Sequence, residues 1–386
     1  MRILHTADWH IGKKLGRIDR RDEVEKALDE LVGIADSNDV DAVLVAGDLF
    51  DRGTPPLDSL RLVLDALTRL AAGGRKVVAI PGNHDSPELF KVLAPLLDKL
   101  DITLVHKPLR PDEGGIVTVP SRDGSMSARV ACVPFIHEAF VIDVMEAPEQ
   151  GYKSYADRIR AITRFYADWM VEHPDPKAVD LLMGHFMVHG AVPGGSEREL
   201  HIGEAYMANA DAIPPDLKYA ALGHIHLAQD APGSATPARF CGSLLQLDFG
   251  EVDQDKSVCI VDVEPGMRPA RVECIPMTSG RKLVKVTDTL EALRARAADF
   301  GDAWLHVVVK TEGPEPGLAD EVRSFLPNAL QVYADYERED FIPQSREGRT
   351  LAQLYSDYVT AKRGVEPPPP LAEAFERVAA EVGAHL

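Results

Sequence analysis

The first 280 residues of the chain alternate two hydrophobic patterns. Nearly continuous apolar runs end at a glycine or a polar residue, as in DAVLVAG (41–47), RKVVAIPG (75–82) and VDLLMGH (179–185). Such runs are typical of strands buried on both faces. Between them, apolar residues recur at helical spacing, at Val24, Leu28, Leu31 and Ala35 and again at Leu57, Leu60, Leu64 and Leu67. The alternation predicts a layered α/β fold with helices outside the sheets.

The same alternation continues along the chain. A longer helix is predicted over 155–169, and further strands are predicted at 128–135, 238–242, 257–263 and 271–277. From about residue 282 the pattern changes to a β-α-β-α-β module of about 60 residues, within the usual range for a small domain. We therefore expect three segments, at 1–280, 281–342 and 343–386.

The third segment holds two helical patterns separated by VEPPPP (365–370). The proline run is expected to be non-helical and to act as a stiff spacer. A short helix pair cannot bury much of its own apolar face. It either docks on a partner protein or packs back on its own chain, and the sequence leaves both interpretations open.

Composition and charge limit the classes of protein. The chain is rich in acidic residues, with a formal net charge of −19. A protein that coats nucleic acid by charge alone is usually basic, because its affinity comes largely from phosphate neutralisation. A local site of bound metals and a few basic residues, or a partner that makes most of the duplex contact, remains compatible with this charge.

Three further features indicate a cytoplasmic protein. No run approaches the ~20 apolar residues of a membrane span, and the start MRILHTADWH does not resemble a signal peptide. The four cysteines, Cys132, Cys241, Cys259 and Cys274, are far apart and form no C-x-x-C pair. We expect them to be reduced core residues rather than a disulfide framework.

Polar side chains gather where the predicted buried strands end. Five strand ends carry them: Asp8 and His10, Asp48 and Asp51, Asn83 to Asp85, His185, and His224 and His226. In open α/β folds, ligands collect beyond the carboxyl ends of strands. Each group alone fits an ordinary turn or a helix cap. Two divalent metals held by nitrogen and oxygen ligands explain all five together.

The spacing of His224 and His226 leaves their arrangement open. On a strand, residues two apart share a face, but Gly223 indicates that the strand has already ended. The two side chains bind one metal, bind two different metals, or are polar residues at a strand edge.

In chain order, D-x-H, G-D-x-x-D, G-N-H-D, G-H and G-H-x-H resemble the motifs of the calcineurin-like metallophosphoesterases. The segments HTADWHIG, VDAVLVAGDLFDRGTPP, IPGNHDS, YAALGHIH and CGSLLQLDFGE are similar to those of the SbcD nucleases, the nuclease subunits of bacterial SbcC–SbcD complexes. The resemblance is strong over about the first 260 residues, and later segments match only in arrangement. It implies an α/β fold, a metallophosphoesterase two-sheet β-sandwich flanked by helices, plus a small α+β capping domain and C-terminal helices.

The resemblance also implies the ligand set of two divalent metal ions per chain, usually Mn²⁺ in this family. One ion would be held by Asp8, His10 and His226 and the other by Asn83, His185 and His224, with Asp48 bridging them. His224 and His226 would then address different ions, with Ile225 between them turned toward the core.

His84 is the expected catalytic residue, because the family uses it on the scissile phosphate rather than as a ligand. The alternative is a histidine that only orients a ligand. Asp51 stands where archaeal and eukaryotic relatives carry a histidine, and a carboxylate cannot replace an imidazole proton donor at neutral pH unless its pKa is strongly raised. We expect Asp51 to support the site or the turn.

Basic residues near the metal loops are the expected DNA contacts: Lys13, Lys14, Arg17 and Arg52. A solvated approach to the next helix explains the first three equally well. Residues 57–67 and 87–100 carry apolar faces that either form a dimer interface or pack in the core.

The resemblance implies a metal-dependent DNA nuclease. It would degrade duplex ends in the 3′ to 5′ direction and cut single strands and hairpins. It would act with an SbcC-type ATPase, bound through the C-terminal helices, in DNA end processing, repair and recombination. A homodimer within a heterotetramer, associated with the nucleoid, is expected. A small-substrate phosphodiesterase or phosphatase is the alternative. A silent scaffold is disfavoured because all seven ligand positions and His84 are intact.

Overall fold

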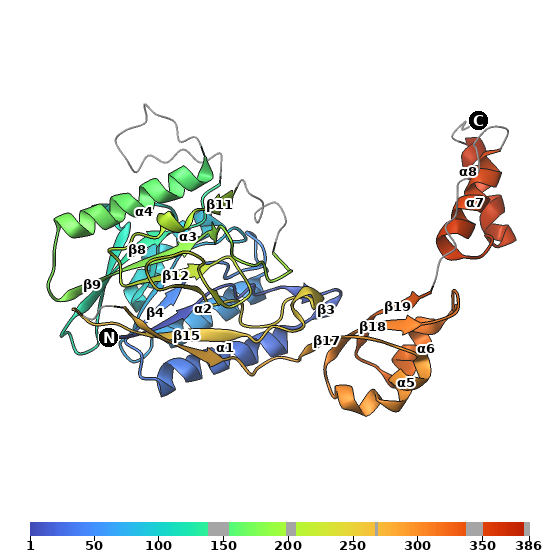
Figure 1. Cartoon of the computed structure of the whole chain (residues 1–386), viewed down its shortest axis with the longest axis horizontal. Helices are drawn as coiled ribbons and strands as arrows, with labels where there is room; N and C mark the ends of the chain where they lie inside the picture. The colour runs from blue at the N-terminus through green and yellow to red at the C-terminus, as the bar shows by residue number, and fades with distance from the viewer. Residues whose placement is uncertain (138–153, 198–205, 267–268, 337–349, 382–386) are drawn as a thin grey trace. The chain divides into compact units, whose positions relative to one another are not determined.

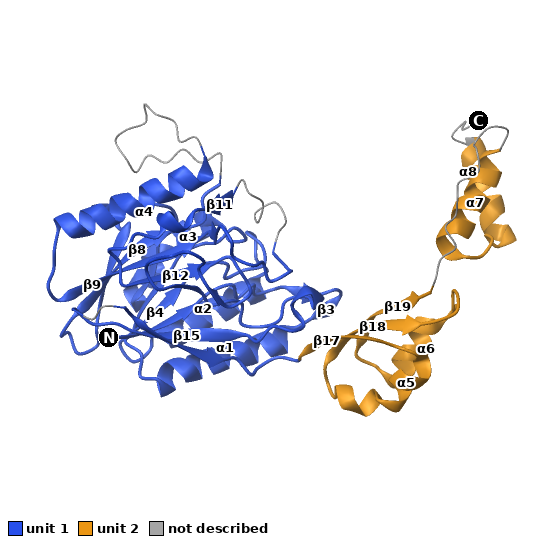
Figure 2. Ribbon diagram, viewed as in Figure 1, with its two compact units in different colours: residues 1–281 blue, residues 282–386 orange. Residues whose placement is uncertain are grey.

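The computed structural model describes residues 1–386 except 138–153, 198–205, 267–268, 337–349 and 382–386 (Figure 1). The chain forms two compact units, Met1–Arg281 and Lys282–Leu386 (Figure 2). The first segment predicted from sequence ended at residue 280. The second unit contains both later segments, and the boundary expected at 342–343 lies outside the described residues.

One sheet of the first unit has the strand order β16-β15-β1-β4-β5-β6. Its parallel strands are β1 (Arg2–Thr6), β4 (Ala42–Val45), β5 (Lys76–Ala79) and β6 (Ile102–Leu104). Antiparallel strands β15 (Ser257–Asp262) and β16 (Arg271–Pro276) complete it. Its outer face packs on α1 (Arg21–Ser37), α2 (Leu57–Ala71) and α3 (Pro87–Leu97).

The other sheet has the order β13-β14-β12-β9-β8-β7. Its strands are β7 (Ile116–Pro120), β8 (Ser127–Val133), β9 (Ala178–His185), β12 (Tyr219–Gly223), β13 (Gln229–Asp230) and β14 (Ala238–Phe240). Helix α4 (Tyr155–Glu172) covers its outer face, where Ile162 and Tyr166 pack with Leu182 and Leu222.

The two sheets face each other across a shared core. Along β4, Val43 and Val45 point to the helices, whereas Leu44 packs with Leu181 and Tyr219 of the opposite sheet. A strand alternates its side chains between two faces, so a strand apolar on both must be covered on both. The predicted two-sheet sandwich flanked by helices is confirmed.

Short elements complete the first unit. They are the hairpin β2 (Lys14–Leu15) and β3 (Ile18–Asp19), the pair β10 (Met187–Val188) and β11 (Met207–Ala208), and the 3₁₀ turns η1 (Asp98–Leu100), η2 (Pro111–Glu113), η5 (Ala210–Ala212) and η6 (Phe249–Glu251).

The second unit begins with a parallel three-stranded sheet. Strands β17 (Leu283–Asp288), β18 (Trp304–Lys310) and β19 (Ala329–Asp335) alternate with α5 (Leu290–Ala295), the 3₁₀ turn η7 (Ala297–Phe300) and α6 (Leu318–Phe325). Leu293 and Val322 of the helices pack on Leu305 and Val307 of the central strand. The order is the β-α-β-α-β pattern expected from the sequence.

Two helices follow, α7 (Leu351–Arg363) and α8 (Pro369–Glu381), with the rings of Tyr355 and Phe375 stacked 3.9 Å apart. The expectation that the whole proline run is non-helical is wrong, because Pro369 and Pro370 open α8. Proline is tolerated in the first turn, where its missing N–H would have no partner within the helix. Among the helices of the described residues, none is long and apolar enough to cross a membrane.

Candidate metal centre

The polar residues predicted from sequence lie together at the ends of five strands. Strands β1, β4 and β5 bring Asp8, His10, Asp48, Asn83 and His84 from one sheet, and β9 and β12 bring His185, His224 and His226 from the other. All eight side chains are buried, each at most 8% exposed. Burying so many polar groups is costly unless they are paired or bind a cation.

The backbone is left-handed at half of these positions. Asp8, His10, Asp48 and His224 have φ angles of 53°, 48°, 53° and 93°. Only Asp39 and Asp101 share this feature among the other non-glycine residues that the structure describes. Such conformations cost about 1–3 kcal/mol each and cluster at functional sites. The chain therefore bends sharply after each strand to turn these side chains inward.

Two glycines let the strand ends approach closely. A Cβ on Gly82 would lie 2.1 Å from Asp48 Oδ1, and one on Gly47 would lie 2.2 Å from His185 Nδ1. Any larger residue would displace those side chains. The glycines of the G-D and G-N motifs are thus required by packing around the site.

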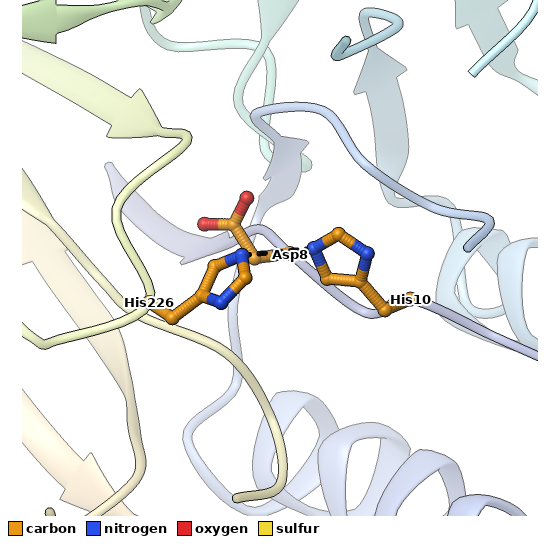
Figure 3. Close-up of side chains that lie close together, drawn as sticks. All are labelled: Asp8, His10 and His226. Atoms are coloured by element: carbon orange, nitrogen blue, oxygen red, sulfur yellow. Dashed lines mark hydrogen bonds between the residues drawn. The ribbon is translucent and has the colours of Figure 1, made fainter. Parts of the chain in front are cut away.

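Asp8, His10 and His226 form a first group (Figure 3). Nε2 of His10 lies 3.0 Å from Nε2 of His226, and potential ligand atoms of the three residues all lie within 4.8 Å of one another.

Asn83, His185 and His224 form a second group. Asn83 Oδ1 is 3.1 Å from His185 Nε2 and 2.9 Å from His224 Nδ1. Asp48 Oδ2 lies 3.5 Å from Nε2 of both His10 and His185, so this carboxylate stands between the groups.

His224 and His226 therefore diverge. The strand ends at Gly223, His224 turns toward Asn83, and His226 turns toward His10. Ile225 between them is fully buried in the core beside α4.

The hydrogen bonds behind the rings direct lone pairs into the centre. His185 Nδ1 donates to the carbonyl of Ala46 at 2.7 Å, which leaves its Nε2 as an acceptor when the ring is neutral. That nitrogen faces Asn83 Oδ1, which is also an acceptor as the amide is oriented here. A proton or a cation must lie between two such acceptors for the contact to be stable. Mixed carboxylate, amide and imidazole donors of this kind fit divalent metals such as Mn²⁺ or Fe²⁺.

The electrostatics of the centre agree with a cation site. Burial alone would lower the pKa of His185. The charge of Asp48, the hydrogen bond between Asp48 and His185, and the charge of Asp8 together raise this pKa to about 9. Burial alone would raise the pKa of Asp48, but the imidazoles of His185 and His10 hold it well below its usual range. The groups around Asp48 thus favour positive charge, whereas burial raises the pKa of Asp8 to about 7.

Sequence reasoning missed the group that supports His226. The fully buried carboxylate of Glu251 accepts a hydrogen bond from His226 Nδ1 at 3.1 Å and pairs with Lys256 Nζ at 2.7 Å. The Ser196 hydroxyl donates a hydrogen bond to the same carboxylate. The Glu197 carboxylate accepts a hydrogen bond from the backbone N–H of His226 at 2.9 Å. Carboxylates of this kind fix the tautomer of a metal-binding histidine. The GE at the end of CGSLLQLDFGE was the available signal.

Asp85, which the sequence placed at a strand end without a role, supports the loops of the centre. Its carboxylate accepts hydrogen bonds from the N–H groups of Leu49, Phe50 and Gly82 at 2.9–3.1 Å. It therefore ties the loop after β4 to the loop after β5, and so holds Asp48 and Asn83 in one place.

His84 lies against the first group. The centroids of the His84 and His10 rings are 4.6 Å apart, and potential ligand atoms of His84, His10 and Asp48 lie within 4.8 Å of one another. Its Nδ1 donates to the Asp51 carbonyl at 2.8 Å, and its backbone N–H donates to Asp48 Oδ1 at 2.8 Å. The Asp51 side chain points elsewhere and pairs with Lys13 at 3.5 Å.

The four basic residues expected to contact DNA differ in exposure. Lys14 and Arg17 are exposed on the β2–β3 hairpin, and the Arg52 side chain is 63% exposed. Lys13 is half-buried, and both Lys13 and Arg52 pair with Asp51, at 3.5 Å and 3.9 Å.

Comparisons with known proteins show the family of the chain. Residues 1–228 match the family model described as calcineurin-like phosphoesterase, and residues 279–363 match the model described as type 5 capsule protein repressor C-terminal domain. The SbcD subunit of nuclease SbcCD from Bacillus subtilis (strain 168) is 36% identical over 286 residues, which cover 74% of this chain and 72% of the relative. The SbcD subunit of nuclease SbcCD from Escherichia coli (strain K12) is 28% identical over 377 residues, covering 94% and 92%.

The chain belongs to the calcineurin-like phosphoesterases, and it is a metal-dependent phosphodiester hydrolase. Within that class it belongs to the SbcD family of nucleases. The family predicted from the strand-end motifs is confirmed. The family and the buried Asp and His groups together support the binding of two metal ions.

Proposed function

We propose that this chain is a DNA nuclease that holds two Mn²⁺ ions at the ends of its five central strands. Asp8, His10 and His226 would hold one ion, Asn83, His185 and His224 the other, and Asp48 both. The observation that carries the proposal is the position of Asp48, 3.5 Å from a histidine of each group.

The chain's own residues have distinct roles in this proposal. Bound there, two divalent cations supply Lewis-acid polarisation of a phosphate and activation of a water nucleophile. Asp48 fixes the two positions relative to each other. The neutral ligands of the second group leave net positive charge, which attracts a phosphodiester.

His84 is proposed to act on the substrate. With Nδ1–H donated to the Asp51 carbonyl, Nε2 is the ring atom that would address a phosphate or leaving oxygen. As an imidazolium it can donate a charge-assisted hydrogen bond to developing negative charge. Asp51 then acts as a positioning residue through its main chain.

The substrate and partners follow from the family and the surface. We propose 3′ to 5′ degradation of duplex ends and cutting of single strands and hairpins, with Lys13, Lys14, Arg17 and Arg52 contacting DNA. An SbcC-type ATPase would bind α7 and α8, where Tyr358 and Val378 are 59% and 57% exposed. A homodimer would form through α2 and α3, where Leu57 and Val92 are 82% and 73% exposed.

A cleavage assay tests the activity. The purified chain with Mn²⁺ is incubated with end-labelled duplex DNA, hairpin DNA and a chromogenic phosphodiester, with and without the ATPase partner and ATP. We expect shortening of duplexes from 3′ ends and opening of hairpins. Hydrolysis of the small ester alone would instead support a small-substrate phosphodiesterase.

Substitution of His84 separates catalysis from metal binding. His84→Ala is expected to keep two metals per chain and lose nearly all hydrolysis, because the residue acts on phosphate. Elemental analysis of the dialysed protein gives the metal content. A large drop in bound metal would assign His84 to the ligand shell.

The DNA contacts are tested by salt dependence. The pair Lys13→Ala and Lys14→Ala should lower the slope of log affinity against log salt by about 1 for each phosphate that the chain no longer neutralises. Lys26→Ala, which changes an exposed lysine on α1, is the matched control. An unchanged slope in the double variant would remove this surface from the DNA path.

A further inference from the structure

Two of the four cysteines lie opposite each other on neighbouring strands. Cys259 of β15 and Cys274 of β16 are partners in the antiparallel register. The Met277 N–H donates to the Lys256 carbonyl at 2.8 Å, so these two residues are a hydrogen-bonded pair. Hydrogen-bonded pairs then recur at Val258 and Ile260 along β15. The cysteines fall between those pairs, at a non-hydrogen-bonded pair.

That type of pair brings side chains close together. Opposed Cα atoms there lie about 4.5 Å apart, within the separation that a disulfide can bridge but at its short end. Pro276, paired with Ser257, occupies the neighbouring non-hydrogen-bonded pair of the ladder. A proline has no N–H to donate, so its presence there agrees with a non-hydrogen-bonded pair at the cysteines. Both thiols are reduced in the structure.

The two thiols differ in environment. Cys259 is fully buried in the core between the sheets, whereas Cys274 is exposed on the edge strand. The hydrogen bond from the Cys259 thiol lowers the pKa of Cys274, and the nearby Arg239 guanidinium lowers it further. An exposed thiol with thiolate character next to a second thiol is the arrangement of a reactive and a resolving cysteine.

The remaining cysteines are not exposed, although Cys241 lies near Cys259 and Cys274. Cys132 and Cys241 are fully buried, and burial raises the pKa of each. Cys132 is opposite Met183 in its sheet, not opposite a thiol. The expectation that all four cysteines are core residues is therefore wrong for Cys274, because β16 lies at the edge of its sheet.

We propose that Cys259 and Cys274 are a redox modification site, a cross-strand dithiol that a hydroperoxide converts to a reversible disulfide. The Cys274 thiolate attacks the peroxide oxygen, which breaks the O–O bond, gives a sulfenic acid and releases hydroxide or alkoxide. The Cys259 thiol then attacks the Cys274 sulfur, forms the S–S bond and expels water. The peroxide gains the two electrons that the dithiol loses.

The disulfide would tie down one particular edge of the first unit. Strand β16 is the last strand before Lys282, and β15 pairs in turn with β1, where Cys259 is opposite His5. Oxidation would thus fasten β16, at the end of the first unit, to β15, the neighbour of the strand that leads to Asp8. Thiol–disulfide exchange with a reductant would reverse the modification.

Thiol counting in the full chain tests the proposal. After treatment with a small excess of hydrogen peroxide, the denatured protein should show two free thiols instead of four, and dithiothreitol should restore all four. A non-reducing peptide map should link the peptides that contain Cys259 and Cys274. A raised melting temperature of the oxidised protein, absent in Cys274→Ser, would accompany the bond.

Cys274→Ser is the informative variant because that side chain is exposed. It should keep its three thiols under the same treatment, and Cys132→Ala should still lose two. Sulfinic acid at Cys274 with Cys259 free, or a disulfide between two chains, would overturn the proposal. The thiol count does not depend on metal or DNA, so it can fail while the nuclease activity stands.

Discussion

The two halves of the metal centre differ in charge. In the first group, Asp8 contributes a carboxylate, and the buried carboxylate of Glu251 lies behind His226. Negative charge thus reaches this half both directly and through the imidazole.

The second group has no carboxylate of its own besides the shared Asp48. Asn83 supplies an amide, and the His185 nitrogen that faces away from the centre donates to the Ala46 carbonyl and not to a carboxylate. We infer that the first half binds a cation more tightly, and that the second half leaves more positive charge available to a substrate phosphate. The difference shows that two metal positions in one pocket can be tuned separately by groups behind the ligands.

The largest effect is expected at the residue the halves share. Asp48→Asn should weaken the binding of both Mn²⁺ ions by about 100-fold or more, since it removes the common charge while keeping the oxygen that accepts the His84 N–H. Titration calorimetry with Mn²⁺ measures both steps. Asp65→Asn, on the exposed side of α2, is the control. Loss of only one step would mean that Asp48 serves one half.

A smaller and unequal effect is expected at Asp8. Asp8→Asn should weaken the tighter Mn²⁺ step the most, by about 100-fold. Asp8 lies with His10 and His226, although its carboxylate is also within 4.8 Å of ligand atoms of Asp48 and His185. The converse change, Asn83→Asp, should tighten the weaker step. Equal weakening of both steps in Asp8→Asn would contradict the asymmetry between the halves.

Glu251 tests whether the asymmetry acts through a residue that is not a ligand. Glu251→Gln keeps the size of the side chain but removes its charge, and should weaken the tighter step by about 10-fold to 100-fold. Circular dichroism checks the fold, and Glu264→Gln, an exposed change, is the control. If the fold of Glu251→Gln changed while its metal affinity did not, Glu251 would stabilise the fold without influencing metal binding.

The smallest effect concerns pH. Burial would raise the pKa of Glu251, but the hydrogen bond from His226 and the charge of Lys256 lower it to about 2. A carboxyl group whose pKa is lower in the folded than in the unfolded chain raises the free energy of unfolding at pH values above its unfolded-state pKa. This contribution is lost as the pH falls toward its folded-state pKa. The metal-free chain should therefore exceed metal-free Glu251→Gln in free energy of unfolding by about 0.5 kcal/mol less at about pH 4 than at about pH 5. Urea unfolding at several pH values measures it, and a widening difference would contradict the assignment.

Much of this centre could be predicted because its residues follow buried strands directly. Asp8, Asp48 and His185 come within three residues of a strand end, and parallel strands deliver their ends to the same edge. The apolar runs also predicted the sandwich itself, because a strand covered on both faces has little polar alternation.

The supporting residues could not be predicted in the same way. Glu251 lies in a 3₁₀ turn far along the chain from His226's strand, and Ser196 lies in a loop after β9. Neither position shows a periodicity, since their contacts arise from how loops fold over the strand ends. Pro369 likewise fits a helix only once its place in the first turn is known.

The left-handed backbone at Asp8, His10, Asp48 and His224 bears on how this chain can change over generations. Glycine would occupy such a conformation with less strain, by roughly 1 kcal/mol at each position. A descendant that exchanged Asp48 for glycine would relieve this strain but would leave the buried His84 N–H without its acceptor. The strained conformation is therefore retained together with the side chains that need it.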